Sequence, residues 1–195
     1  EEFKDVEGHF LKNLGLGVDD SEVIPYYLAS ETKSVGRNYC MPRNEYDQRI
    51  ILQNIYELCE EIGIKLRRLN KKARTIGLYL SGNQTNHGRR TLSYHIDKGS
   101  DIYNLCKNLY DEWNPSMVRQ ISVWAGNLED SVNLTLSLFD TKAKTSKIQS
   151  TIDTLNERFG DHTIRNGFLT NGPNLKTVPN GFMADKLERH KLVNA

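Results

Sequence analysis

The stretch ARTIGLYLSGNQTNHGRRTLSYHID, residues 73–97, decides the fold that we expect. Apolar and polar residues alternate on both sides of GNQTNHG, a turn-rich segment at residues 82–88. A period of two residues is typical of a β-strand that buries one face, and a turn between two such runs predicts a β-hairpin. The residues expected on the buried faces are Ile76, Leu78, Leu80, Leu92, Tyr94 and Ile96.

A strand and a helix are expected before this hairpin. KSVGRNYCM, residues 33–41, predicts a strand that Pro42 stops, because proline cannot continue a ladder of backbone hydrogen bonds. Asn44, with Asp47 three residues later, predicts the N-cap of a helix that runs to about Leu69. Apolar side chains recur there every three or four residues, which gives the helix one buried side. These side chains are Ile51, Ile55, Leu58, Ile62, Leu66 and Leu69.

A helix and then a strand are expected after the hairpin. Ser100 predicts the N-cap of a helix that Asn114-Pro115 ends. MVRQISVWAG, residues 117–126, predicts the last strand. The resulting order, β-α-β-β-α-β, predicts an α+β domain of the split βαβ type, in which two helices cover one face of a four-stranded sheet. A C-terminal helix and a tail are expected beyond this domain.

The face of the sheet that the helices leave open is expected to be polar. It gathers hydroxyls, amides and arginines and few carboxylates. Such side chains donate hydrogen bonds to phosphate oxygens or neutralise their charge, which favours a nucleic-acid partner. The alternatives are an ordinary solvated sheet face and an RNA-binding sheet that stacks bases on aromatic side chains. By alternation this face carries Thr75, Gly77, Tyr79, Ser81, Thr91, Ser93, His95, Gln120, Ser122 and Trp124, with Arg37, Arg74, Arg89, Arg90 and Arg119 at strand ends or edges.

The distribution of charge along the 195 residues is compatible with the same partner. The net charge of +1 hides an acidic N-terminal part, net −6 over residues 1–32, and a basic central part, net +6 over residues 33–125. Residues 126–195 carry a net charge of +1. A basic domain next to an acidic segment suits a polyanion such as DNA.

Metal sites, phosphate-binding loops and disulfides are not indicated. Cys40, Cys59 and Cys106 show no C-x-x-C spacing, the five histidines show no metal-ligand spacing, and no P-loop or G-x-G-x-x-G motif occurs. We therefore expect no catalytic residue, metal or cofactor in this chain. The polar N-terminus, without a signal peptide or an initiator Met, predicts a cytoplasmic fragment of a longer protein. No apolar run reaches the roughly 20 residues that cross a membrane, so no membrane partner is expected.

SVNLTLSLFD, residues 131–140, admits two interpretations. Leu134, Leu136 and Leu138 alternate with polar residues, as in a strand that packs inside the domain or against a helix over residues 147–159. The same run can also be an extended apolar peptide that docks on another protein. The expected helix has an apolar side made of Ile148, Ile152, Leu155 and Phe159.

Several of these segments, in this order, resemble one known family. KSVGRNY after the acidic GVDDS, then ARTIGLYL, TLSYHID and VRQISVWAGNL followed by LSLFD, are similar to the C-terminal "little finger" domain of Y-family translesion DNA polymerases of the ImpB/MucB/SamB type. IDTLNERFGDHTIRNG resembles the tail of Gram-positive-type members. The resemblance implies that residues 1–14 end a preceding thumb domain, 15–32 form a linker, 33–130 form the little finger, 131–140 form a clamp-binding peptide, and 141–195 form a C-terminal helix and tail.

In this family the little finger holds the template-primer duplex by its phosphates, so the resemblance implies sequence-independent DNA binding. Gln120 and Trp124 depart from the arginines that relatives often carry on the last strand. The implied DNA-binding residues are Lys33, Ser34, Gly36, Arg37, Arg74, Thr75, Arg89, Arg90, Thr91, Ser93, Arg119, Gln120, Ser122 and Trp124.

The peptide after the last strand corresponds to the family's docking motif for the replication sliding clamp. Its residues are Thr135, Leu136, Ser137, Leu138 and Phe139, with Thr135 where members usually carry Gln. The polymerase carboxylates, Mg²⁺ and dNTPs belong to a palm domain, so the resemblance implies an error-prone repair polymerase in the full-length protein and no enzyme activity in this part. The implied location is the bacterial cytoplasm, on the nucleoid. An alternative is an interaction module that chiefly recruits a clamp and binds little DNA itself.

Overall fold

The structure, a computed structural model, describes residues 5–23, 25, 32–133, 143–160 and 163–170. Contacts divide the chain into two units, Glu1–Glu31 and Thr32–Ala195. The first unit contains helix α1 (Asp5–Gly15), which falls almost entirely within residues 1–14, the segment that the resemblance assigns to a preceding thumb domain. All strands and the remaining helices belong to the second unit.

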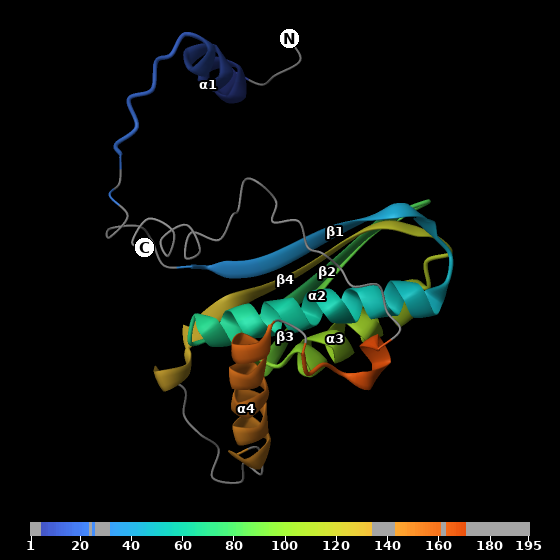
Figure 1. Ribbon diagram of the computed structural model, residues 1–195. Coiled ribbons are helices and arrows are strands. Elements are labelled where there is room, and N and C mark those ends of the chain that lie inside the picture. Colours follow the sequence, from blue (N-terminus) through green and yellow to red (C-terminus); the bar gives the residue numbers. More distant parts are fainter. Residues whose placement is uncertain (1–4, 24, 26–31, 134–142, 161–162, 171–195) are drawn as a thin grey trace. The chain divides into compact units, whose positions relative to one another are not determined.

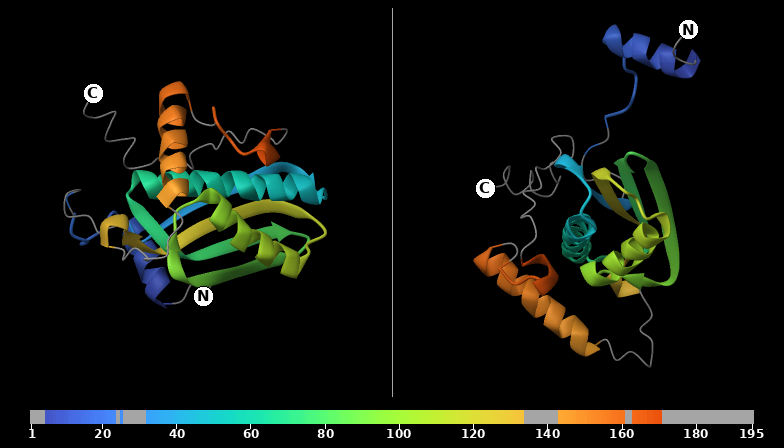
Figure 2. Two further views of the ribbon diagram at one scale, coloured as in Figure 1. Left: turned by 90° about the horizontal axis from the view of Figure 1, so that it is seen from below. Right: turned by 90° about the vertical axis from the view of Figure 1, so that its right-hand side faces the viewer.

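One antiparallel sheet with the strand order β1-β4-β2-β3 forms the centre of the second unit. Its strands are β1 (Ser34–Glu45), β2 (Lys71–Gly82), β3 (Thr85–Ile96) and β4 (Val118–Asp130). Helices α2 (Gln48–Arg68) and α3 (Gly99–Trp113) both lie on one side of this sheet (Figures 1 and 2). Since β4 separates β1 from β2, and β2 separates β4 from β3, each helix joins two parallel strands with one strand between them. The expected β-α-β-β-α-β fold of the split βαβ type is confirmed.

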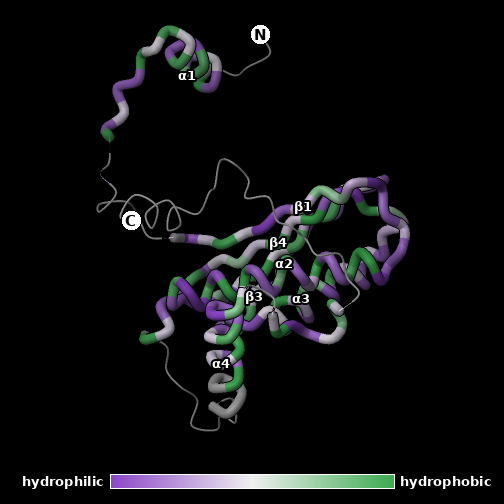
Figure 3. The backbone as a smooth tube through the Cα atoms, viewed as in Figure 1, coloured by the Kyte–Doolittle hydropathy of each residue, from purple (hydrophilic) through white to green (hydrophobic). Residues whose placement is uncertain are grey.

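The core lies between the sheet and the two helices. Hydrophobic and hydrophilic residues alternate around α2 (Figure 3), and its hydrophobic side faces the sheet. Each large apolar side chain that folding removes from water contributes about 1.5–3 kcal/mol. Fully buried members include Ile55, Leu58, Ile62 and Leu66 of α2, Ile76, Leu78 and Leu80 of β2, Ile102 and Leu109 of α3, and Ile121 and Val123 of β4.

Two glycines set the close approach of α2 and α3. A Cβ on Gly63 would lie 2.8 Å from the backbone nitrogen of Gly99, and a Cβ on Gly99 would lie 2.5 Å from the Glu60 carboxyl carbon.

Helix α3 begins at this contact, with Lys98 at the N-cap and no side-chain cap, so the expected cap at Ser100 is wrong. The expected cap at Asn44 is wrong as well. Asp47 caps α2 by accepting hydrogen bonds from the backbone nitrogens of Arg49 and Ile50.

Pro42 does not end the first strand, contrary to expectation. Strand β1 continues to Glu45, with a shift in its register against β4 between Cys40 and Glu45. Because β1 is an edge strand, the missing N–H of proline costs no hydrogen bond on the unpaired side, and the irregularity accommodates the ring. Arg119 donates a hydrogen bond to the backbone carbonyl of Met41 within this irregular segment.

A second irregularity changes β3. Ala73 pairs with Ile96 and Thr75 pairs with Thr91, so a single residue of β2 faces a longer segment of β3. The expected inward alternation therefore breaks. Ile96 is buried, but Tyr94 is 53% exposed, and its expected burial is wrong.

Helix α4 (Ala143–Phe159) and a short 3₁₀ helix (Gly167–Leu169) form a third layer beyond α2, on the side away from the sheet (Figure 2). The helix expected over residues 147–159 is confirmed, but its expected apolar side is only partly buried. Ile148 and Phe159 are 58% and 62% exposed. Apolar packing of the 3₁₀ helix, where Leu169 is 1% exposed, and polar contacts together attach this layer. Arg67 of α2 donates to both carboxylate oxygens of Asp153, at 2.6 and 2.9 Å.

The segment after α4 is tied to α2 by a buried ion pair. Arg165 Nη2 donates to Glu57 Oε2 at 2.5 Å, and the Glu57 side chain is 2% exposed. Nearby, the side-chain amide of Gln53 donates to the backbone carbonyl of Phe168 at 2.8 Å. Charges removed from water in this way stabilise a fold only while both partners are present.

Replacing one member of that pair should therefore destabilise the domain. Arg165→Gln removes the Arg165 cation from the buried Glu57 carboxylate and should lower the free energy of unfolding by about 3 kcal/mol. The double change Glu57→Gln, Arg165→Gln should recover part of this loss. Urea unfolding followed by circular dichroism measures both. Arg158→Gln is the matched control, because Arg158 is exposed, and it should cost less than about 0.5 kcal/mol. Equal losses for the two arginine variants would contradict the role of the pair.

Candidate nucleic-acid interface

The register of the sheet arranges the residues of the open face in four cross-strand rows. Residues directly opposite each other in antiparallel strands point to the same face, and the buried residues of β2 and β4 mark the other face. In the order β1, β4, β2, β3, the rows are Ser34, Gly126, Thr75, Thr91; then Gly36, Trp124, Gly77, Arg89; then Asn38, Ser122, Tyr79, His87; and finally Cys40, Gln120, Ser81, Thr85. None of these sixteen positions, four on each of four strands, is Asp or Glu.

The Trp124 side chain lies along this face, and its ring covers Gly77 of the neighbouring strand. A Cβ on Gly77 would be 2.1–2.5 Å from the ring atoms Cε2, Nε1 and Cζ2, a separation that real atoms do not adopt. A Cβ on Gly126 would be 3.2 Å from Cζ3, and one on Gly36 would be 3.4 Å from Trp124 Cβ. The ring therefore covers Gly77 directly, while Gly36 flanks it on the other side. The tryptophan itself is partly exposed.

Hydrogen bonds between strands fix several polar side chains of the face. Thr75 Oγ1 lies 3.0 Å from Thr91 Oγ1 and accepts from the Asn127 side-chain amide at 2.9 Å. Ser122 Oγ donates to Asn38 Oδ1 at 2.6 Å. Thr75 is only 4% exposed, so it positions its neighbours and offers little surface to a ligand.

Eight of the predicted DNA-binding residues lie in the four rows. They are Ser34, Gly36, Thr75, Arg89, Thr91, Gln120, Ser122 and Trp124. Lys33, just before β1, and Ser93, in the irregular part of β3, are both exposed. Arg74 occupies the irregularity of β2, is exposed, and donates from Nε to the backbone carbonyl of Leu92 at 3.0 Å. Their role toward DNA remains a prediction.

Two predicted arginines lie on the wrong side of the sheet for this interface. Arg37 pairs in register with Val123 and Arg90 with Ile76, and both partners face the helices. Accordingly, Arg37 Nε donates to Glu61 of α2 at 3.0 Å. Arg90 forms an ion pair with Glu112 of α3 at 2.5 Å. Their expected place at the open face is wrong, and counting the alternation from Val35 and Ile76 would have shown it.

The remaining predicted arginine, Arg119, is held away from the rows by its bond to the Met41 carbonyl. It is partly buried beside the irregular end of β1. Arg89 differs from these arginines, because it is exposed in a row of the open face and no ion pair with another described residue involves it. Asn38, Tyr79 and His87 share the face but were not predicted as DNA-binding residues.

Acidic residues of β4 lie at one end of the sheet, beyond the four rows, and each has a basic partner. Asp130 pairs with Lys71 at 2.9 Å, and Glu129 lies 3.2 Å from His95 Nε2. Burial lowers the pKa of His95; Arg74 and Lys72 act in the same direction, and Glu129 opposes them. His95 is therefore mostly neutral at pH 7 and adds little positive charge to the face.

The described part of the chain offers no metal-binding cluster, and the Cys59 thiol of the core is not activated. No group of three His, Cys, Asp or Glu side chains there could hold a metal ion. The Sγ atoms of Cys59 and Cys106 lie 3.9 Å apart in the core, and burial raises the pKa of the Cys59 thiol, which suppresses the reactive thiolate. Among the described helices, none combines the length and the apolar character that crossing a bilayer requires.

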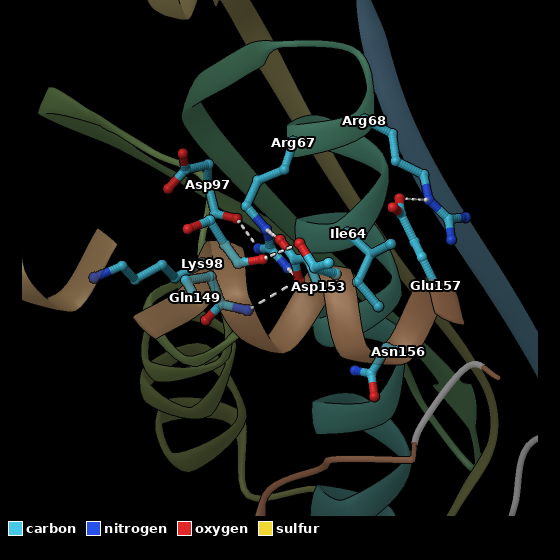
Figure 4. A pocket seen from close by; sticks show the side chains of 11 residues that line it. Ile64, Arg67, Arg68, Asp97, Lys98, Gln149, Asp153, Asn156 and Glu157 are labelled. Carbon is cyan, nitrogen blue, oxygen red and sulfur yellow. Dashed lines mark hydrogen bonds and ion pairs between the residues drawn. The ribbon is translucent and has the colours of Figure 1, made fainter. Parts of the chain in front are cut away.

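A cavity of about 300 Å³ opens between α2 and α4 (Figure 4). Most of its charged lining is already paired. Arg67 holds Asp153 and the backbone carbonyl of Asp97, and Arg68 lies 3.8 Å from Glu157. The cavity therefore offers no cluster of side chains poised for catalysis, and the open sheet face remains the candidate site.

Comparison with known proteins identifies relatives for most of this unit. A model described as the impB/mucB/samB family C-terminal domain matches residues 32–138, a range that contains all four strands together with α2 and α3. DNA polymerase IV 2 of Halalkalibacterium halodurans is 28% identical over 166 residues, which cover 82% of this chain and 40% of that protein. DNA polymerase IV of Acetivibrio thermocellus is 30% identical over 182 residues, 88% of this chain and 45% of that protein. The chain thus spans less than half the length of these relatives.

Two further comparisons concern a repair protein and a solved complex. The putative UV-damage repair protein UvrX of Bacillus subtilis is 28% identical over 76% of this chain and 37% of its own length. A solved complex of beta-clamp processivity factor and little finger domain of PolIV aligns with a TM-score of 0.42 and 16% identity, over 55% of this chain and 99% of that chain. The last alignment is too distant to assign a function or a partner.

The expected resemblance to the ImpB/MucB/SamB type is thus confirmed. The matching family model covers more than half of the chain and includes the whole sheet with the two helices packed on it. The chain belongs to the impB/mucB/samB family, and residues 32–138 are its C-terminal, little-finger domain.

Proposed function

We propose that this domain binds duplex DNA through its open sheet face, without reading the base sequence. One observation carries the proposal: the four cross-strand rows contain no acid, although 25 Asp and Glu residues occur in the chain. The acids of β4 lie beyond the rows: Asp130 pairs with Lys71, and Glu129 lies beside the mostly neutral His95. A phosphate backbone that approaches the four rows meets no carboxylate there.

The exposed groups of the face suit phosphate oxygens. Arg89, Arg74 and Lys33 are exposed cations on or beside it, and hydroxyl and amide donors lie between them. Contacts to phosphates position a protein on a duplex and carry no sequence information. Binding of this kind would hold a distorted template as firmly as a regular one, which is what bypass of a damaged base requires.

The polymerase activity itself would belong to the rest of a longer protein. Relatives called DNA polymerase IV are more than twice as long as the part they share with this chain. We expect the catalytic carboxylates, the Mg²⁺ ions and the dNTP pocket in that remaining part. This domain would then be the DNA-gripping part of an error-prone repair polymerase that acts on the nucleoid in a bacterial cytoplasm.

A second proposed function is docking on the replication sliding clamp. The candidate peptide, Thr135 to Phe139, lies outside the described residues and follows the short 3₁₀ helix Ser131–Asn133 that ends β4. Two apolar anchors, Leu138 and Phe139, would fill a pocket on the clamp. A short peptide of this kind binds with roughly micromolar affinity. Weak docking allows polymerases to exchange on one clamp.

A salt titration with paired arginine variants tests the DNA interface. The affinity of the 195-residue chain for a blunt duplex should fall linearly with the logarithm of salt concentration, because bound phosphates release counterions. Arg89→Gln should lower the affinity and reduce the slope by about one unit. Arg90→Gln is the matched control, since Arg90 pairs with Glu112 on the helix side, and it should change neither. A flat salt response, a strong preference for one sequence, or equal effects of the two variants would contradict the interface.

Clamp docking is tested separately. The double change Leu138→Ala, Phe139→Ala should abolish binding to a bacterial sliding clamp in a pull-down and in calorimetry, because it removes both anchors. Duplex affinity should not change. Val132→Ala serves as the control, because Val132 is exposed next to the motif but outside it. Clamp binding that survives the double change would show that the motif is assigned wrongly.

A further inference from the structure

We propose that Trp124 is a stacking platform for an unpaired DNA base. The inference rests on the proposed function, because it assigns a ligand to the centre of the same face. It adds single-stranded DNA to the duplex as a partner. The rest of the argument concerns the ring, its surroundings and the kind of base that can reach it.

The ring is laid flat by its neighbours. The strands on both sides of Trp124 present glycine in the same row, Gly36 on β1 and Gly77 on β2. With a Cβ on Gly77 the ring would have to lift by more than an ångström, since the two would be 2.1 Å apart. One face of the indole thus rests on the sheet. Trp124 is partly exposed, so the other face is available to a ligand.

An arginine, Arg89, lies in the same cross-strand row as Trp124. Arg89 lies opposite Gly77 on β3, two strands away from Trp124, which is about 10 Å between backbones. Arg89 is exposed, so its guanidinium can reach a phosphate next to a base that lies on the indole. An aromatic plate beside a basic group is the combination that proteins use to bind single-stranded nucleic acid.

The geometry selects an unpaired base over a paired one. Bases inside a duplex are covered above and below by their neighbours, and the grooves present only their edges. A ring lying along the sheet presents its face and not its edge. Face-to-face stacking therefore requires a nucleotide outside the duplex, such as one in the template strand beyond the primer end.

The second tryptophan provides an internal control. Trp113 of α3 lies on the helix side of the sheet, where a Cβ on Gly88 would be 2.9 Å from its Cζ2 atom. It packs against the core and is remote from the open face. Trp113→Phe keeps an aromatic ring there and leaves Trp124 as the only tryptophan of the chain.

Fluorescence of the Trp113→Phe chain tests the stacking. Oligo(dT) should quench the emission of Trp124 as it binds, because a stacked base quenches an indole, whereas a blunt duplex of equal length should quench it much less. In the otherwise unchanged chain, Trp124→Met keeps an apolar cover over Gly77 but cannot stack. It should weaken oligo(dT) binding about tenfold and should weaken blunt-duplex binding much less. Trp124→Phe should retain most of the oligo(dT) affinity.

The outcomes separate this inference from the proposed function. Unchanged emission on saturation with oligo(dT), or equal oligo(dT) affinities of Trp124→Met and the parent chain, would mean that the ring only shields the sheet. Such a result overturns the stacking, while salt-dependent duplex binding would still support the proposed function. Absence of duplex binding by the parent chain would instead refute the function. Thermal unfolding of each variant verifies that the comparison is between folded proteins.

Discussion

The burial of two amphipathic helices on a single face of the sheet is the constraint on which the rest depends. Helices α2 and α3 fill the same side of the four strands, and the fully buried residues of β2 and β4 point toward them. Since each strand alternates sides, every residue between those buried ones is placed on the open face. The close contact of Gly63 with Gly99 keeps the two helices side by side in this layer. The third layer, α4, adds to the outside of α2 and leaves the open face uncovered (Figure 2).

The four rows of the open face lack carboxylates and carry hydrogen-bonded polar side chains around one aromatic ring. Glu61 and Glu112 pair with arginines on the helix side, and Asp130 and Glu129 lie beside Lys71 and His95 at the end of the sheet. Polar side chains such as Thr75 and Ser122 bond to neighbours across the strands, which makes the surface rigid. In the middle, glycines on two strands make room for one large ring. A rigid, acid-free surface suits a polyanion, and the ring gives this surface a feature that simple phosphate contact does not need.

Much of this arrangement could be predicted from the alternation of residues. The hairpin from residue 73 to 97 and the open face follow from it, because burial on one face imposes a period of two on a strand. The two helices follow from apolar residues that recur every three or four positions. The errors have local physical causes. Pro42 is tolerated because β1 lies at an edge, and Tyr94 is exposed because β3 is irregular opposite Arg74. Arg37 and Arg90 were assigned to the DNA interface because they are arginines. The alternation of their strands places both side chains on the helix side of the sheet, where they pair with Glu61 and Glu112. The position of the Trp124 ring depends on the glycines beside it on the neighbouring strands. Which residues are neighbours across strands depends on the strand register, and the register cannot be read from the sequence alone.

Amide chemical shifts of the ¹⁵N-labelled chain, recorded with and without a blunt duplex at low salt, test the central claim most directly. Our account predicts shift changes along β2, β3 and β4 at Gly77, Arg89, Ser122 and the Trp124 indole N–H. It predicts no changes in α4 or on the outer side of α2. Changes concentrated on α2 and α4, with the indole N–H unmoved, would contradict the account, because the duplex would then lie on the helical side of the domain.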